Sequence, residues 1–169
     1  MVELGRQAAA SVQLPWKETG SLVLRRGPYV IAAGLDESDA QNHAYVLRGR
    51  YINLFDSKQT PTLNPELLPN SRKLLVDLAV VERDGKPRIV AAACRIKNVT
   101  STNRMLSFHA DGVADSTAVV TVFLPNKPGE VRLGGKAMDK GQYHYEDHLL
   151  RVEFPNSTDE VSVEIDLKK

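Results

Sequence analysis

Two apolar runs on either side of Arg83-Asp84-Gly85 constrain the fold of this chain more than any other feature. Every second residue is apolar from Leu74 to Val80, and the same holds from Val90 to Ile96. Alternate residues of a β-strand share a face, so each run predicts a strand with one buried side. Together the runs predict an antiparallel hairpin at the centre of a sheet.

The length of the connecting loop decides whether the two apolar rows lie on the same face. A two-residue Asp84-Gly85 loop would separate them, whereas a three-residue loop beginning at Arg83 unites them. A type I turn followed by a left-handed residue has this length, and glycine adopts that conformation at little cost. We therefore expect a left-handed Gly85 and one buried row made of Leu74, Val76, Leu78, Val90, Ala92, Cys94 and Ile96.

Short segments rich in β-branched and aromatic residues recur along the rest of the chain. They predict strands over residues 22–25, 29–33, 45–47, 51–55, 105–109, 117–124, 149–154 and 161–167, and a hairpin around Gly134-Gly135. Prolines at 61, 65 and 69 predict an extended connection over residues 56–72, and no segment predicts a helix longer than a turn or two. Such spacing is typical of an all-β fold, an antiparallel two-sheet β-sandwich of the Ig-like or jelly-roll-like kind with almost no helix.

Length and composition favour one ordinary globular domain. The chain has 169 residues, which suits a lead-in segment over 1–19 and a single β-sandwich domain over 20–169. The net charge of +1 gives no field that would attract nucleic acid, and no apolar run approaches the roughly 20 residues of a membrane span. The single cysteine, Cys94, lies in the apolar row, so we expect a buried structural thiol rather than a nucleophile.

Histidines give the first candidate site. His144 and His148 have the i, i+4 spacing at which two imidazoles share a zinc ion on a helix. Their setting between a turn and a predicted strand favours a polar connection, and a metal site there is the alternative. A small metal-dependent hydrolase built on His109, His144 and His148 is therefore one alternative function. An enzyme is not the first choice, because the sequence contains no catalytic motif. A protein–protein interaction module is the other alternative.

Acidic and aromatic residues give the second candidate site. Asp36, Glu37 and Asp39 lie in a polar loop after the predicted strand 29–33, where carboxylates could hold calcium or a polar ligand. No cofactor is expected from the sequence, although this loop makes calcium possible. Trp16 and Tyr145 could stack on the apolar face of a sugar ring, although packing in or on the protein is the more common role of such residues.

Two parts of the sequence resemble a known class of domain. Residues 25–38 (RRGPYVIAAGLDES) and 47–56 (LRGRYINLFD) resemble β-sandwich regions near the C-terminus of large bacterial glycoside-hydrolase-like proteins. Residues 119–125 (VVTVFLP), 131–136 (VRLGGK) and 145–154 (YEDHLLRVEF) are similar to the closing sandwich of many glycosidases. The resemblance covers roughly residues 20–168.

The resemblance implies a function as well as a fold. In such proteins catalysis lies in a separate barrel, which this chain does not contain. The chain is therefore expected to be a non-catalytic accessory module of a carbohydrate-active protein, and its partner would be a catalytic domain or a glycan. As part of a longer secreted protein, it would be extracellular or periplasmic.

Overall fold

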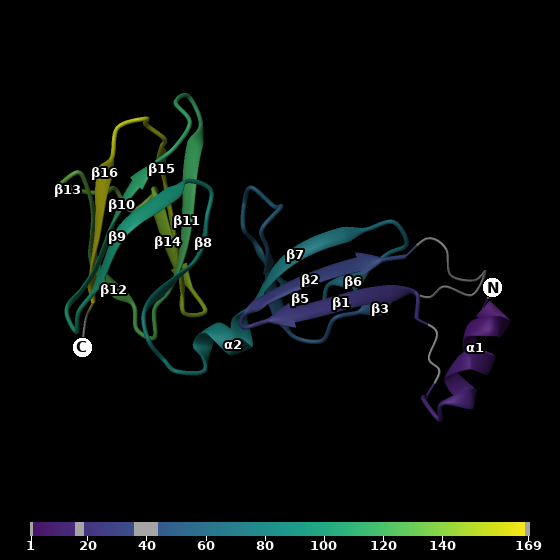
Figure 1. The fold of residues 1–169 in the computed structure, drawn as a ribbon. Coiled ribbons are helices and arrows are strands. Elements are labelled where there is room, and N and C mark those ends of the chain that lie inside the picture. The colour runs from purple at the N-terminus through teal and green to yellow at the C-terminus, as the bar shows by residue number, and fades with distance from the viewer. Residues whose placement is uncertain (1, 16–18, 36–43, 168–169) are drawn as a thin grey trace.

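The computed structural model describes residues 2–15, 19–35 and 44–167, and these residues form an all-β fold. Within the described ranges, sixteen strands are arranged in antiparallel sheets, and the two helices, α1 (Val2–Ser11) and α2 (Leu78–Glu82), are short. The expected all-β, sandwich-like fold class is confirmed. Figure 1 shows two β-structured halves side by side, with α2 between them and α1 beyond the N-terminal half. No helix in the described part is long and apolar enough to cross a membrane.

The N-terminal half is built on a five-stranded sheet with the order β1-β2-β7-β4-β5. Its strands are β1 (Ser21–Arg26), β2 (Tyr29–Gly34), β7 (Arg72–Asp77), β4 (Arg50–Asn53) and β5 (Pro61–Leu63). A two-stranded sheet of β3 (Tyr45–Val46) and β6 (Glu66–Leu67) accompanies it. The core of this half is a cluster of buried residues, namely Val30, Ala32, Leu47, Tyr51, Leu67 and Leu75.

The C-terminal half is a sandwich of two sheets. One has the order β13-β12-β16-β10-β9 and consists of β13 (Lys136–Ala137), β12 (Pro128–Leu133), β16 (Val161–Leu167), β10 (Met105–Asp111) and β9 (Arg95–Ser101). The other has the order β14-β15-β11-β8 and consists of β14 (Tyr143–Glu146), β15 (Leu149–Pro155), β11 (Thr117–Phe123) and β8 (Arg88–Ala92). Alternate residues such as Leu106, Val120 and Val163 fill the space between the sheets.

A third apolar cluster joins the two halves. It combines Ile52 and Val76 from the N-terminal sheet with Leu78 and Val81 from α2, and with Val90, Ala91, Phe123 and Leu149 from the sandwich. Leu78 and Val81 lie three positions apart, so one side of α2 is buried in this cluster. The halves therefore share a continuous apolar contact, and the single domain expected over residues 20–169 stays a prediction.

The predicted 74–96 hairpin is wrong. β7 pairs with β2 and β4, whereas β8 pairs with β11 in a different sheet, so the expected register does not form. The first apolar run ends at Asp77, whose side chain accepts a hydrogen bond from the backbone N–H of Ala79 and begins α2. Gly85 is left-handed as expected, with a φ of +63°, but it follows the helix and does not close a hairpin.

Helix α1 and residues 56–72 also differ from expectation. α1 is ten residues long, although the sequence predicted no helix beyond a turn or two. The Ala8-Ala9-Ala10 run near its C-terminal end has high helix propensity without an apolar period, and Leu4 is exposed. The segment expected to be an extended connection contains β5 and β6. The Gly134-Gly135 hairpin is confirmed, and both glycines have positive φ.

Candidate functional site

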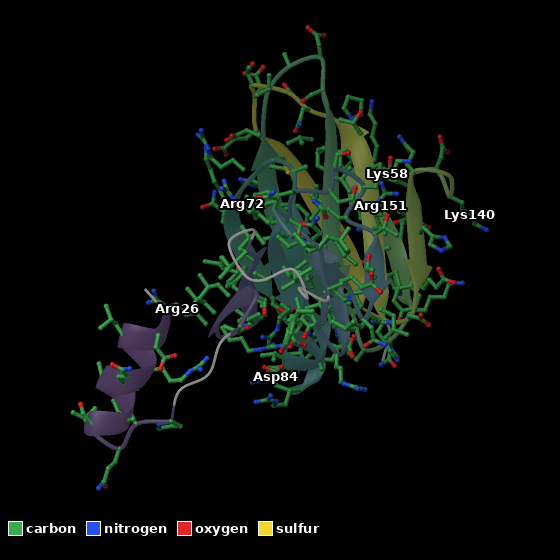
Figure 2. The ribbon with its side chains drawn as sticks, turned by 90° about the vertical axis from the view of Figure 1, so that its right-hand side faces the viewer. Arg26, Lys58, Arg72, Asp84, Lys140 and Arg151 are labelled. Carbon is green, nitrogen blue, oxygen red and sulfur yellow. The ribbon has the colours of Figure 1, made fainter. Side chains whose placement is uncertain are left out.

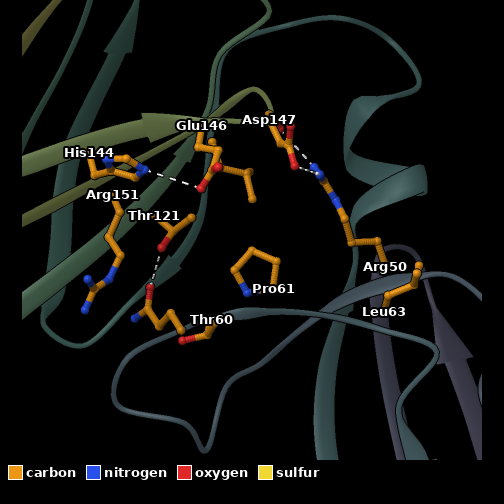
Figure 3. Close-up of a pocket in the computed structure, with 11 residues that line it drawn as sticks. Arg50, Thr60, Pro61, Leu63, Thr121, His144, Glu146, Asp147 and Arg151 are labelled. Atoms are coloured by element: carbon orange, nitrogen blue, oxygen red, sulfur yellow. Dashed lines mark hydrogen bonds and ion pairs between the residues drawn. The ribbon is translucent and has the colours of Figure 1, made fainter.

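A cleft of about 340 Å³ lies where the two halves of the molecule meet. Figure 3 shows the residues that line it, with β5 on one side and β14 on the other. Both strands are at the edges of their sheets, so neither is covered by a further strand along this opening. The lining residues are Arg50, Gln59, Thr60, Pro61, Leu63, Thr121, His144, Glu146, Asp147, Leu149 and Arg151.

Buried side chains from both halves form the floor of the cleft. The Gln59 amide nitrogen donates a hydrogen bond to the Val119 carbonyl at 3.2 Å, and its oxygen accepts one from the Thr121 hydroxyl at 2.8 Å. Gln59 has a positive φ of 51°, which is uncommon for a residue other than glycine. These bonds hold the turn before β5 against β11, and Leu149 adds an apolar surface to the same floor.

Asp56 shapes the turn that carries Gln59 and Thr60. One carboxylate oxygen accepts a hydrogen bond from the Lys58 backbone N–H at 3.0 Å, and the other accepts from that of Thr60 at 3.2 Å. These two bonds lower the pKa of Asp56 because they favour the ionised carboxylate. Figure 2 shows Lys58 and Arg151 on the same side of the molecule. The turn is thus held by its own hydrogen bonds as well as by those to the sandwich.

Ion pairs surround the cleft. Arg50 donates to Glu82 at 2.8 Å and to the Asp147 backbone carbonyl at 2.9 Å, and it lies 3.3 Å from the Asp147 carboxylate. Arg151 pairs with Glu153 on β15. Glu146 has a looser partner, because the His144 ring nitrogen is 3.4 Å from its carboxylate and both side chains are largely exposed. The lining therefore offers both donors and acceptors to solvent.

The structure places three of the predicted site residues on or beside β14, with different partners. His144 lines the cleft, whereas Tyr145 points to the opposite face, where its hydroxyl donates to the Leu124 carbonyl at 3.1 Å. Burial raises the pKa of Tyr145. The His148 Nδ1 lies 3.0 Å from the Pro125 carbonyl oxygen, and His148 is exposed in the turn before β15.

His109 lies in the other sheet of the sandwich, on β10, next to Asn98 and Glu160. Among the described residues, no three histidine, cysteine or acidic side chains are placed to hold a metal ion together. His109 therefore lies in a different sheet from His144, and the predicted His144–His148 metal site stays a prediction. Trp16, Asp36, Glu37 and Asp39 lie outside the described residues.

Comparisons with protein-family models, curated proteins and solved structures give no match. The function must therefore be argued from the surfaces themselves.

Several residues of the cleft were not among the sequence-based candidates. Arg50, Gln59 and Thr121 are far apart in the sequence and belong to no motif. The only local signal was the polar His144–Glu146 segment in front of an apolar strand. The cleft depends on the contact between the halves, which the sequence alone did not show.

A second candidate surface is one face of the N-terminal sheet. In β2, Val30 and Ala32 are buried while Tyr29 and Ile31 are about half exposed, at 50% and 54%. Directly paired residues point to the same face, so Leu24, Ile31 and Leu74 form one row across β1, β2 and β7. We call the exposed part of this face, made of Leu22, Leu24, Tyr29 and Ile31, the open apolar face.

In the C-terminal half, the sandwich carries an ion-pair network on β9 and β10. The Lys97 ammonium lies 2.6 Å from both the Asp111 and the Glu160 carboxylates, and Arg95 lies 3.5 Å from Asp111. The Lys97 hydrogen bonds lower the pKa of both carboxyl groups.

Burial raises the pKa of the Cys94 thiol, and the charge of Asp111 raises it further. A raised pKa does not favour the reactive thiolate form of Cys94.

Replacing Lys97 with methionine is expected to reduce the dependence of stability on pH in the acidic range. Carboxyl groups whose pKa is lowered on folding stabilise the fold above their ordinary pKa, and this contribution is lost as the pH falls through the folded-state values. The Lys97→Met variant should be less stable than the wild type at neutral pH, and the difference should shrink towards acid. Urea denaturation from about pH 7 to about pH 3 measures it.

The matched control for this prediction is Lys127→Met, because Lys127 is exposed and makes no ion pair with a described residue. Its stability curve should follow that of the wild type at every pH. If the Lys97→Met and wild-type curves were also parallel, the network would contribute nothing to the acid response.

Proposed function

We propose that this chain is a non-catalytic β-sandwich accessory module of a carbohydrate-active protein, and that it packs against the catalytic domain through the open apolar face. The observation that carries the proposal is the exposure of this face. Leu22 and Leu24 on β1 are 48% and 54% exposed, and they lie beside Ile31 and Tyr29 on β2. Contiguous apolar surface of this kind marks protein interaction sites.

The face continues a contact that already exists within the chain. The row that contains Tyr29 runs on through Val76 and Ile52, both of which are buried under α2 and the sandwich. One end of the same sheet face is therefore covered by α2 and the sandwich, and the other end is open. A second folded domain can cover the open end in the same way.

Two cations stand at the rim of the open apolar face. Arg26 follows Leu24 on the same side of β1. Arg72 on β7 is paired with Ala33 on β2. Both are exposed, and neither makes an ion pair with a described residue. The partner surface is therefore expected to be apolar at its centre, with carboxylates opposite these two arginines. Figure 2 labels both residues.

The composition of the face favours a protein partner over a glycan. Sugar rings bind to flat aromatic surfaces, and the open apolar face offers one aromatic ring, Tyr29, among aliphatic side chains. Leucine and isoleucine are typical of the contact between two domains. Packing, rather than glycan contact, is the role that this surface supports.

Replacing Ile31 with glutamate tests the proposal. The coding sequence that flanks this chain would be expressed as a separate catalytic domain and titrated with the chain by calorimetry. The wild type should bind, and Ile31→Glu should weaken the affinity about 30-fold or more, because a charge would be buried at the centre of the contact. Ile31 is half exposed, so the variant should keep the wild-type circular dichroism.

Val99→Glu is the matched control. Val99 is 55% exposed on β9, in the sandwich, and its substitution should leave the affinity unchanged. Equal binding by wild type and Ile31→Glu would contradict the proposed surface. A flanking sequence that encodes no carbohydrate-active domain would contradict the proposed function itself.

A further inference from the structure

The cleft between the halves has the volume of a small-ligand site. Its volume of about 340 Å³ falls within the 300–1,000 Å³ that is typical of such sites. Its floor is buried, since Gln59, Thr121 and Leu149 are each less than 7% exposed. Its walls are exposed side chains of β5 and β14, so a ligand can enter from solvent.

The charges that line the cleft disfavour an ionic ligand. Arg50 and Arg151 contribute two positive charges, and Glu146 and Asp147 contribute two negative ones. An anion bound beside the two guanidinium groups would also lie close to the two carboxylates, and a cation bound beside the carboxylates would also lie close to the guanidinium groups. Either ion would gain attraction from one pair and repulsion from the other.

An apolar ligand is disfavoured as well. Among the described residues, the Glu146 carboxylate has only the 3.4 Å contact with His144, so most of its acceptor positions are free for water. The Thr60 hydroxyl also makes no hydrogen bond with a described residue. A purely apolar ligand would remove this water without replacing its hydrogen bonds. A ligand that carries many hydroxyl groups replaces them.

We propose that this cleft binds a neutral, polyhydroxylated ligand of one or two sugar rings. The Glu146 and Asp147 carboxylates accept hydrogen bonds from its hydroxyl groups, and the Arg50 guanidinium donates to its oxygen atoms. Pro61 and Leu63 on the β5 side pack against its C–H surface. Figure 3 shows these residues around the same opening, with Glu146 and Asp147 across from Pro61.

This site is independent of the proposed packing partner. The open apolar face lies on β1 and β2, whereas the cleft lies between β5 and β14, at the other edge of the N-terminal sheet. A module that packs through β1 and β2 therefore keeps the cleft accessible. Binding at the cleft can be measured with the chain alone, and its failure would leave the packing proposal unaffected.

Saturation-transfer NMR with neutral sugars tests the site. Glucose, galactose, xylose, maltose and cellobiose would each be added to the wild-type chain, together with glucuronate and spermidine as an anionic and a cationic probe. At least one neutral sugar should receive saturation from the protein, with a dissociation constant in the millimolar range because the cleft lacks an aromatic platform. The charged probes should receive none.

Glu146→Gln identifies the site of binding. The loss of the carboxylate should weaken the affinity about tenfold, as expected when a charge-assisted hydrogen bond is removed. Glu66→Gln is the matched control, since Glu66 is exposed on β6 and does not line the cleft. Amide shifts in a 15N spectrum should change at Thr60, Leu63 and Asp147.

Three outcomes would overturn the proposal. The first is the absence of transfer to every neutral sugar in the panel. The second is a preference for spermidine or glucuronate, which would assign an ionic ligand to the cleft. The third is equal loss of affinity in Glu146→Gln and Glu66→Gln, or shifts confined to residues away from β5 and β14, which would place the sugar elsewhere.

Discussion

Replacing Phe123 with alanine is expected to lower the free energy of unfolding by about 3–5 kcal/mol, the usual effect of truncating a buried phenylalanine. Phe123 is 3% exposed and belongs to the cluster that joins the halves, where it is grouped with Ile52 and Val76 of the N-terminal sheet. Its ring also lies 6.4 Å from that of His148. The truncation would leave a cavity that neither half can fill without moving relative to the other.

Urea denaturation followed by circular dichroism measures the loss. Phe55→Ala is the matched control, because the same truncation is made at a residue that is 69% exposed. A surface substitution of this kind should change the stability by no more than about 0.5 kcal/mol. A similar loss in the two variants would show that the contact between the halves contributes little.

Scanning calorimetry adds a test of the single domain predicted from the sequence. Because an apolar cluster joins the halves, we expect one transition in the wild type and a broader or divided one in Phe123→Ala. Two separate transitions in the wild type would show that the halves unfold independently. In that case the chain would contain two domains instead of one over residues 20–169.

Most strands were predictable because their residues alternate. β11 and β16 lie where the sequence placed them, and the Gly134-Gly135 turn joins β12 to β13 as expected. In β16 alternate residues are buried against the opposite sheet, and the period of two records this burial directly. β11 is buried on both faces from Ala118 to Phe123, and its nearly continuous apolar run is what predicted a strand. The fold class could therefore be predicted without knowing which strands pair.

Strand pairing could not be predicted in the same way. Alternation in residues 74–80 and 90–96 says that each segment has an apolar side, but it does not say which sheet covers that side. Asp77 was the decisive residue, because its side chain begins α2 and directs the chain from one half to the other. From the neighbouring sequence alone, Asp77 looks like one more polar residue inside a predicted strand.

The candidate sites were less predictable than the strands. The cleft combines Arg50, Gln59 and Glu146, which line one opening only because the two halves of the molecule are in contact. The open apolar face was partly indicated by the sequence, since Leu22, Val23 and Leu24 are all apolar. These residues predict apolar side chains on both faces of β1, but they do not show that the face with Leu22 and Leu24 is left exposed.

Gly34→Ala is expected to lower the free energy of unfolding by about 3 kcal/mol, as a case of overpacking against backbone. A Cβ atom at this position would lie 1.9 Å from the Leu68 carbonyl oxygen. That oxygen cannot move freely, because it accepts hydrogen bonds from the Ser71 backbone N–H at 3.0 Å and from the Ser71 hydroxyl at 2.6 Å. The Gly34 N–H in turn donates to the Ser71 carbonyl at 2.9 Å.

The end of β2 must therefore separate from the turn that precedes β7 if an alanine is placed at Gly34. Gly141→Ala is the matched control, because a Cβ atom there meets nothing within 4 Å and its φ is not positive. That variant should be as stable as the wild type or slightly more stable, since alanine restricts the unfolded chain. Thermal denaturation of the two variants distinguishes the effects: a large loss in both would indicate a general sensitivity to glycine replacement, and no loss in Gly34→Ala would show that the turn at Leu68 yields without cost.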